Sequence, residues 1–112
     1  MELWQKQAIF TQAVAVLIKQ ISAKGFDCTL GECYRTPEQA AIYAKEGKGI
    51  VDSLHCKRLA IDINLFDKKG QYLTAPESYQ QFGDLWETLN PKFRWGGHFS
   101  RGDGNHFEMQ DT

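Results

Sequence analysis

Two histidines and two aspartates in the second half of the chain could hold a metal ion and carry out acid–base chemistry beside it. Asp62 stands between two isoleucines in an alternating apolar segment, where an ionised carboxylate is costly unless a cation or hydrogen bonds compensate for its burial. His55 precedes this segment, and His106 lies near the C-terminus. Catalytic zinc takes three such ligands and keeps a fourth position for water, which Asp103, three residues before His106, could deprotonate. Spacing alone is a weak signal, because the residues come from separate segments.

Each of these residues also has an ordinary structural interpretation. His55 could be a surface loop residue, Asp62 a strand acid paired with Arg58, and His106 a hydrogen-bonded histidine of the core. Asp103 lies between two glycines, where an aspartate is often only a turn residue. Taken one at a time, these interpretations would be favoured over a metal site.

The periodicity of the chain predicts an α+β fold, with helices packed on a small, mostly antiparallel sheet. Alternation along the predicted strands places Asp62 with Asn64 on one face, and His106 with Glu108 on one face. Asp62 and His106 could therefore meet across neighbouring strands, with Glu108 orienting a ligand. The expected elements are helices over 3–24, 37–46 and 76–89, strands over 26–34, 59–65 and 105–109, a strand break near Gly31 and a loop over 47–58.

The composition indicates one compact domain over residues 1–112 that neither binds nucleic acid nor inserts into a membrane. Thirteen basic and fourteen acidic residues nearly cancel, and no dense cluster of lysine and arginine is present. The longest apolar stretch, 13–18, is far below the roughly 20 residues that span a bilayer. The N-terminus lacks the pattern of a secretory signal, which predicts a protein made in the cytoplasm with reduced thiols at Cys28, Cys33 and Cys56. We expect a monomer.

Four segments together resemble a family of zinc peptidases. The run from Ser53 to Asp62 resembles the Ser-x-His-x-x-Gly-x-Ala-x-Asp motif of the D-alanyl-D-alanine carboxypeptidase and L-alanyl-D-glutamate endopeptidase family. The closing Asp103-x-x-His106-Phe107-Glu108 is similar to the second motif of that family. Tyr34-Arg35-Thr36 with Gln39 and Trp95-Gly96-Gly97 resemble two further segments, so the likeness runs over about residues 30 to 109.

The resemblance implies a fold of the kind shared by these peptidases and the Hedgehog signalling domain. It implies that Zn²⁺ is held by His55, Asp62 and His106, that Asp103 is the catalytic acid and base, and that Arg35 steadies a substrate or transition-state oxygen. Arg35 could equally be a surface arginine paired with Glu38. The substrate implied is the peptidoglycan stem peptide, cut at L-alanyl-D-glutamate or, as an alternative, at D-alanyl-D-alanine.

Small members without export signals resemble phage lysis enzymes, which predicts action on the cell wall after release through a holin-type pore. Two other functions stay open on the sequence: a non-catalytic zinc-binding domain of the same fold, and a metal-free structural protein of a virion. The chain departs from the family pattern at Arg58, which replaces the motif glycine, and at His98, which could compete for the metal or contact substrate.

Overall fold

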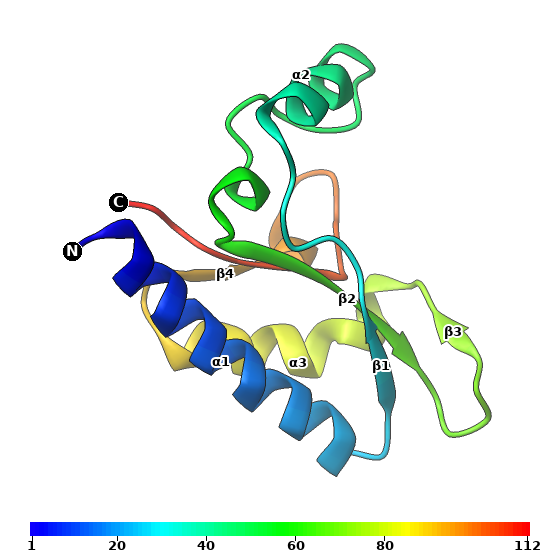
Figure 1. Cartoon of the computed structure of the whole chain (residues 1–112). Helices are drawn as coiled ribbons and strands as arrows, with labels where there is room; N and C mark the ends of the chain where they lie inside the picture. Colours follow the sequence, from blue (N-terminus) through cyan, green and yellow to red (C-terminus); the bar gives the residue numbers. More distant parts are fainter.

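The computed structural model describes residues 1–112 as three α-helices, two short 3₁₀ helices and five strands. Two of the helices lie on one side of the sheet, and the third helix lies on the other side with the first 3₁₀ helix (Figure 1). The elements in chain order are α1 (Leu3–Ala23), β1 (Asp27–Leu30), α2 (Pro37–Lys45), η1 (Leu54–Lys57), β2 (Ala60–Phe66), β3 (Tyr72–Leu73), α3 (Pro76–Leu89), β4 (Phe93–Trp95), η2 (Gly96–His98) and β5 (His106–Met109).

The sheet has the strand order β1-β2-β5-β4, with β3 paired to β2, and every pairing is antiparallel. Helices α1 and α3 cover one face, while α2 and η1 lie beyond the other (Figure 1). The two chain termini lie side by side in Figure 1, where Lys6 forms an ion pair with Asp111 at 2.5 Å. This arrangement confirms the predicted α+β fold with helices on a small antiparallel sheet.

The core lies between β2, β5 and the two helices beneath them. Ile61 and Ile63 of β2 point toward these helices and are buried, as the predicted alternation requires. Trp86 of α3 is completely buried, stacks on Phe93 with ring centroids 4.3 Å apart and donates a hydrogen bond from Nε1 to the carbonyl of Glu108 at 3.0 Å. Trp86 thus packs against the core side of β5, and the polar side chains of this strand lie on its other face.

The predicted helices agree with the structure to within a residue or two. Thr36 caps α2, since its hydroxyl accepts the backbone N–H of Gln39 at 3.0 Å and Pro37 occupies the first turn. Gly25, at φ 87°, follows the end of α1 in the left-handed conformation that favours glycine. No helix combines the length and the apolar character needed to cross a membrane.

The strands and the connecting segments differ more from the prediction. The strand expected over 26–34 ends at Leu30, where Gly31 begins the predicted break. The segment expected to be loop over 47–58 contains η1, and β3 and β4 were not predicted at all. These three elements have four, two and three residues, which is too short for a hydrophobic period to be recognised.

We predict that Tyr79→Phe destabilises the protein by about 1–3 kcal/mol, because a buried hydroxyl is lost from between two strands. The Tyr79 hydroxyl donates to the carbonyl of Leu73 at 2.8 Å and accepts the N–H of Leu65 at 3.1 Å. Urea unfolding measures the effect. The matched control is Tyr72→Phe, because Tyr72 is half exposed and its hydroxyl makes a longer contact, 3.4 Å, with Asn64 Oδ1; an equal loss in both variants would contradict the prediction.

Candidate metal centre

Strands β2 and β5 place Asp62 directly opposite His106 in the antiparallel register. Because Ile61 and Ile63 lie in the core, Asp62 between them lies on the other face of the sheet. His55 reaches the same place from η1. The Nε2 atom of His55 and the Nδ1 atom of His106 each lie 3.4 Å from Asp62 Oδ1. One ligand atom from each of the three residues falls within 4.8 Å of the others, so the structure brings together all three predicted ligands.

The three side chains fit a metal ion. Asp62 Oδ1 is buried and has no hydrogen-bond partner, which is costly for an ionised oxygen. The two imidazoles that face it are also buried, at 3% exposure for His55 and 8% for His106. Two imidazole nitrogens and one carboxylate oxygen are the donors that a catalytic zinc site uses, with a further position left for water. A bound cation would satisfy the unpaired oxygen of Asp62.

The charges within this cluster lower the pKa of Asp62 and raise the pKa of His106. Burial opposes ionisation of Asp62, but the two imidazoles outweigh it and hold the pKa of this carboxyl at about 2. Burial likewise opposes protonation of His106, yet the carboxylates of Asp62 and Glu108 raise the pKa of His106 to about 9. In the absence of metal, the positive charge that balances Asp62 is therefore a proton on His106.

Contacts of its backbone and of one ring nitrogen hold His55 in place. The Ser53 hydroxyl caps η1 by accepting the backbone N–H of His55 at 3.2 Å. On the ring, Nδ1 lies 3.4 Å from the carbonyl oxygen of Cys33 and 3.6 Å from Glu32 Oε1. Because both neighbours are acceptors, Nδ1 is the nitrogen placed to donate to them, and Nε2 is the nitrogen that faces Asp62. The interpretation of His55 as a surface loop residue is wrong.

His106 is oriented by its own strand. Its Nε2 atom lies 2.7 Å from Glu108 Oε1, the contact that the shared strand face predicted. Glu108 is buried, and its other oxygen accepts Nε of Arg94 from β4 at 2.8 Å and also pairs with the Nη2 group. With Nε2 engaged in this way, Nδ1 of His106 is the nitrogen that faces Asp62.

Asp103 lies in the turn before β5, beside the cluster. Its Oδ2 atom is 3.8 Å from Nδ1 of His106, and its side chain is 54% exposed. Burial of part of the carboxyl raises the pKa of Asp103, an effect that the charge on His106 opposes. The turn is closed by Gly96, whose carbonyl accepts the N–H of Asp103 at 2.9 Å. A Cβ at position 96 would lie 2.2 Å from the carbonyl oxygen of Asp103, so only glycine fits there.

Arg35 lies on the segment that leads from β1 to α2, and it pairs with Glu32 rather than with Glu38. Its Nε and Nη2 atoms lie 2.8 Å and 2.5 Å from Glu32 Oε1. The guanidinium also stacks over the ring of Tyr43 at 4.9 Å and is close enough for its charge to act on the pKa of Asp103. Its expected contact with a substrate oxygen stays a prediction.

The other side chains singled out by the sequence lie outside the ligand cluster. His98 is half exposed, and its Nδ1 atom lies 3.1 Å from Glu87 Oε1. Arg58 does not pair with Asp62, because its guanidinium lies over the ring of Tyr34 at 4.1 Å. All three cysteines are free thiols.

Sequence reasoning missed Glu32 and Arg94 as neighbours of the two histidines. Glu32 lies three residues before Arg35, but this spacing predicts an ion pair only within a helix, and residues 32–35 lie outside one. Arg94 could not be found either, because its short strand was itself not predicted.

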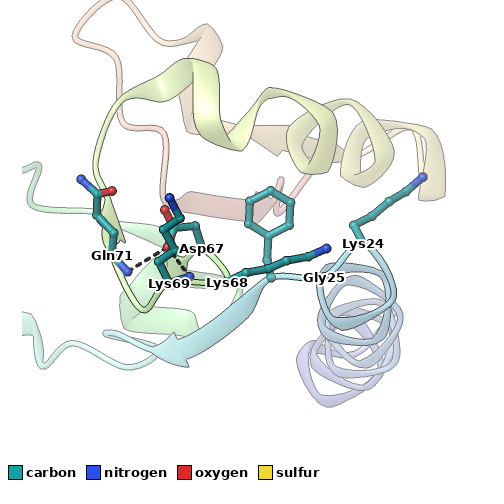
Figure 2. A pocket seen from close by; sticks show the side chains of 7 residues that line it. Lys24, Gly25, Asp67, Lys68, Lys69 and Gln71 are labelled. Atoms are coloured by element: carbon teal, nitrogen blue, oxygen red, sulfur yellow. Dashed lines mark hydrogen bonds between the residues drawn. The ribbon is translucent and has the colours of Figure 1, made fainter.

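Two pockets open near β2. The larger, of about 370 Å³, lies between the end of α1 and the turn after β2, and Figure 2 shows Lys24, Lys68 and Lys69 around it. There the Asp67 carboxylate accepts the backbone N–H groups of Lys69 and Gln71, both at 2.9 Å. None of the predicted site residues lines this pocket. The other, of about 240 Å³, is lined by Tyr72, Thr74, Pro76, Tyr79, Gly102, Asp103, Gly104 and Asn105. Asp103 therefore lines an open pocket.

A sequence model described as D-alanyl-D-alanine carboxypeptidase matches residues 46–109, which is more than half of the chain. The chain belongs to this family. Membership confirms the predicted enzyme class, a metallopeptidase, and the matched region holds His55, Asp62, Asp103 and His106 but not Arg35. Among curated proteins, none matches the chain significantly.

Two solved structures resemble this family member. The L-Ala D-Glu endopeptidase ChiX of Serratia marcescens has a TM-score of 0.63 and 19% identity, over 75% of this chain and 67% of that one. A mutant of the vancomycin resistance D,D-pentapeptidase VanY from a VanB-type cassette, in complex with Zn(II), has a TM-score of 0.60 and 18% identity, over 89% of this chain and 70% of that one. At these identities the likeness shows the fold.

The structure gives a reason for the glycine that the family motif carries where this chain has Arg58. Arg58 ends η1 with φ 54° and ψ 38°, and it is the one non-glycine residue of the chain with positive φ. This left-handed conformation costs a residue with a Cβ roughly 1 kcal/mol relative to glycine. In this chain the stacking of Arg58 on Tyr34 offsets part of that cost, by about 0.5–1 kcal/mol.

We predict that Arg58→Ala is less stable than Arg58→Gly by about 1 kcal/mol, because both lose the contact with Tyr34 but only glycine relieves the backbone strain. Urea unfolding of the two variants side by side measures the difference. Alanine as stable as glycine at this position would show that the left-handed conformation is not adopted in solution.

We predict that the metal-free protein loses stability as pH rises from about 6.5 to about 9, the range between the ordinary pKa of histidine and that of His106 in the folded protein. Protonated His106 stabilises the folded protein fully at pH values below about 6.5, and this stabilisation is lost at pH values above about 9. Zinc should remove the loss, because it needs the unprotonated nitrogen. Urea unfolding midpoints measured across this pH range, with chelator and with zinc, test the effect. If the midpoint of His106→Gln falls with pH as steeply as that of the metal-free wild type, the prediction is contradicted.

Proposed function

We propose that this chain is a zinc-dependent peptidase that cleaves the stem peptide of peptidoglycan, with the L-alanyl-D-glutamate bond as its substrate. The observation that carries the proposal is the buried, unpaired Oδ1 of Asp62, 3.4 Å from one nitrogen of each of two buried histidines. Asp103, with Oδ2 3.8 Å from His106 and beside a pocket, adds an acid at the place where a reacting water would lie.

In this proposal Nε2 of His55, Oδ1 of Asp62 and Nδ1 of His106 hold the zinc ion. When bound, the ion supplies Lewis-acid polarisation of the scissile carbonyl and lowers the pKa of water to about 7. The carboxylate of Glu108 and the carbonyl of Cys33 keep the two imidazoles in the required orientation by accepting from their outer nitrogens.

Asp103 would act as the base and then as the acid. Its carboxylate takes a proton from water as the water oxygen bonds to the carbonyl carbon, and it returns that proton to the leaving amine as the C–N bond breaks. The raised pKa of Asp103 suits a group that must carry a proton between these two steps. Arg35 would donate to the oxygen that becomes negative in the transition state, where one lost donor typically costs about 100-fold in rate.

Of the relatives, ChiX supports the L-alanyl-D-glutamate bond, while the other two descriptions favour the D-alanyl-D-alanine bond. ChiX is described as an L-Ala D-Glu endopeptidase and VanY as a D,D-pentapeptidase, while the matching family is described as D-alanyl-D-alanine carboxypeptidase. These descriptions all name peptidases that act at D-amino acids, and they differ in the bond. The D-alanyl-D-alanine bond is therefore the alternative that the product analysis below must distinguish.

We also propose that the protein is a monomeric phage lysis enzyme, made in the cytoplasm and acting on the cell wall after a holin-type pore opens the membrane. This setting rests on the resemblance of the sequence motifs around His55 and His106 to a family that includes phage lysis enzymes. Expression in a bacterial host with and without a holin, followed by culture turbidity, tests it. Lysis only with the holin would support the proposal, whereas lysis without one would contradict it.

We predict that zinc-loaded protein releases new amino groups from purified peptidoglycan and that Asp103→Asn lowers kcat by about 100-fold or more while still binding zinc. His106→Ala should lose both activity and tightly bound zinc. The matched control is Asp52→Asn, an exposed acid in the loop before η1. Amine release, zinc content and fragment masses are measured together, and the masses identify the bond.

Two results would contradict the proposed function. A folded, zinc-loaded wild type that releases no amino groups would instead be a zinc-binding domain without peptidase activity. A folded wild type that binds no zinc would exclude metal-dependent hydrolysis altogether.

A further inference from the structure

Each of the two histidines that face Asp62 has a glutamate at its outer ring nitrogen, and each glutamate is held by an arginine. On one side Glu108 lies 2.7 Å from Nε2 of His106 and is paired with Arg94. On the other side Glu32 Oε1 lies 3.6 Å from Nδ1 of His55 and is paired with Arg35. The two sides differ in one respect, because Arg35 and not Arg94 is expected to contact substrate.

The backbone of residues 32–35 forms hydrogen bonds with two of the candidate metal ligands, Asp62 and His55. The carbonyl of Glu32 accepts the N–H of Asp62 at 2.9 Å, and the N–H of Arg35 donates to the carbonyl of His55 at 3.1 Å. Residues 32–35 therefore lie along the metal centre and are bonded to two of its three candidate ligands. A side chain in this segment can transmit its position to both His55 and Arg35.

We propose that Glu32 is a positioning residue that links Arg35 to the metal centre through His55. A single oxygen, Oε1, accepts from both Nε and Nη2 of Arg35 and faces Nδ1 of His55. This inference rests on the proposed function, for which it identifies the residue that holds the oxyanion donor and one metal ligand in a common frame.

The chemistry of the three groups explains how one carboxylate can serve both neighbours. A guanidinium has five N–H donors in a fixed plane, so the two that engage Glu32 leave others for a substrate oxygen. An imidazole that donates from Nδ1 presents the lone pair of Nε2 to a metal, and a carboxylate near Nδ1 increases the basicity of that lone pair. Loss of the negative charge at Glu32 would weaken both effects.

A purely structural role for Glu32 predicts a different outcome. Its side chain is 27% exposed and lies three residues from Arg35, and a partly exposed pair of this kind contributes only about 0.2–1 kcal/mol to stability. Such a pair would change the unfolding midpoint but neither the zinc affinity nor the rate of the folded protein. Zinc affinity and kcat therefore distinguish the two roles.

The first experiment compares wild type with Glu32→Gln, Glu32→Asp and the control Glu38→Gln, an exposed acid of α2 that forms no ion pair. Zinc Kd is measured by competition with a chelator, and kcat and KM are measured on a soluble peptidoglycan fragment. We expect Glu32→Gln to raise the zinc Kd about 10-fold and to lower kcat at least 10-fold with a smaller change in KM. Glu32→Asp, which keeps the negative charge, should recover part of the zinc affinity and part of kcat. Glu38→Gln should match wild type in both quantities.

The second experiment separates the two links by repeating Glu32→Gln in an Arg35→Ala protein. If Glu32 affects catalysis by holding Arg35, its additional effect on kcat should shrink in this background, whereas its effect on the zinc Kd through His55 should persist. Full additivity in kcat would overturn the link to Arg35.

A zinc Kd and a kcat within twofold of wild type for Glu32→Gln would overturn the inference and leave the proposed function intact. A wild type that binds zinc but cleaves nothing would instead overturn the proposed function. In that case the zinc Kd of Glu32→Gln still decides whether Glu32 positions His55.

Discussion

The rest of this structure depends on a buried carboxylate oxygen without a hydrogen-bond partner, Oδ1 of Asp62. The alternation of β2 sends Ile61 and Ile63 into the core and leaves Asp62 on the opposite face, in register with His106. An ionised group at such a position is tolerated only if a positive charge accompanies it. The proton on His106 supplies that charge in the metal-free protein, and the geometry of the two facing nitrogens suits a zinc ion in its place. The elements around β2 can be understood as the means of holding those nitrogens.

Charges alternate outward from this centre. Asp62 is surrounded by two imidazoles, the imidazoles by Glu32 and Glu108, and these glutamates by Arg35 and Arg94. Each carboxylate therefore has a basic group beside it, so that ionised groups can be accommodated at low exposure without a large unbalanced field. The same arrangement fixes the ring nitrogen that each histidine turns to Asp62. Electrostatic compensation and orientation of the ligands are thus provided by the same side chains.

Backbone constraints explain where glycine is required around the site and where it is not. Gly96 has no substitute, because a Cβ there would lie 2.2 Å from the carbonyl oxygen of Asp103 and 2.9 Å from Cβ of His106. At the end of η1 the family motif has glycine, but nothing sterically excludes a side chain, and the requirement is only for a left-handed conformation. Arg58 meets that requirement at a modest energetic cost while its guanidinium stacks on Tyr34. Glycine is therefore required at position 96, where a side chain would clash, but not at position 58, where only the left-handed backbone conformation favours it.

The sequence by itself determined the features that depend on local periodicity and on residue type. The helix Pro76–Leu89, the capping of α2 by Thr36 and the two faces of β2 could be predicted, because each is set by residues a few positions away in the chain. The candidate ligands were implied by the resemblance of two motifs to a known family, since their spacing alone is a weak signal. Only the tertiary structure decided that Glu32 and Arg94 surround the histidines, that His106 presents Nδ1 and His55 Nε2, and that Arg35 pairs with Glu32 instead of Glu38. These contacts arise from the register of β2, β5 and β4 and from the path of residues 32–35 across the sheet. The contacts of His55 with Glu32 and of Glu108 with Arg94 form between segments that are far apart in the chain, so no local pattern specifies them.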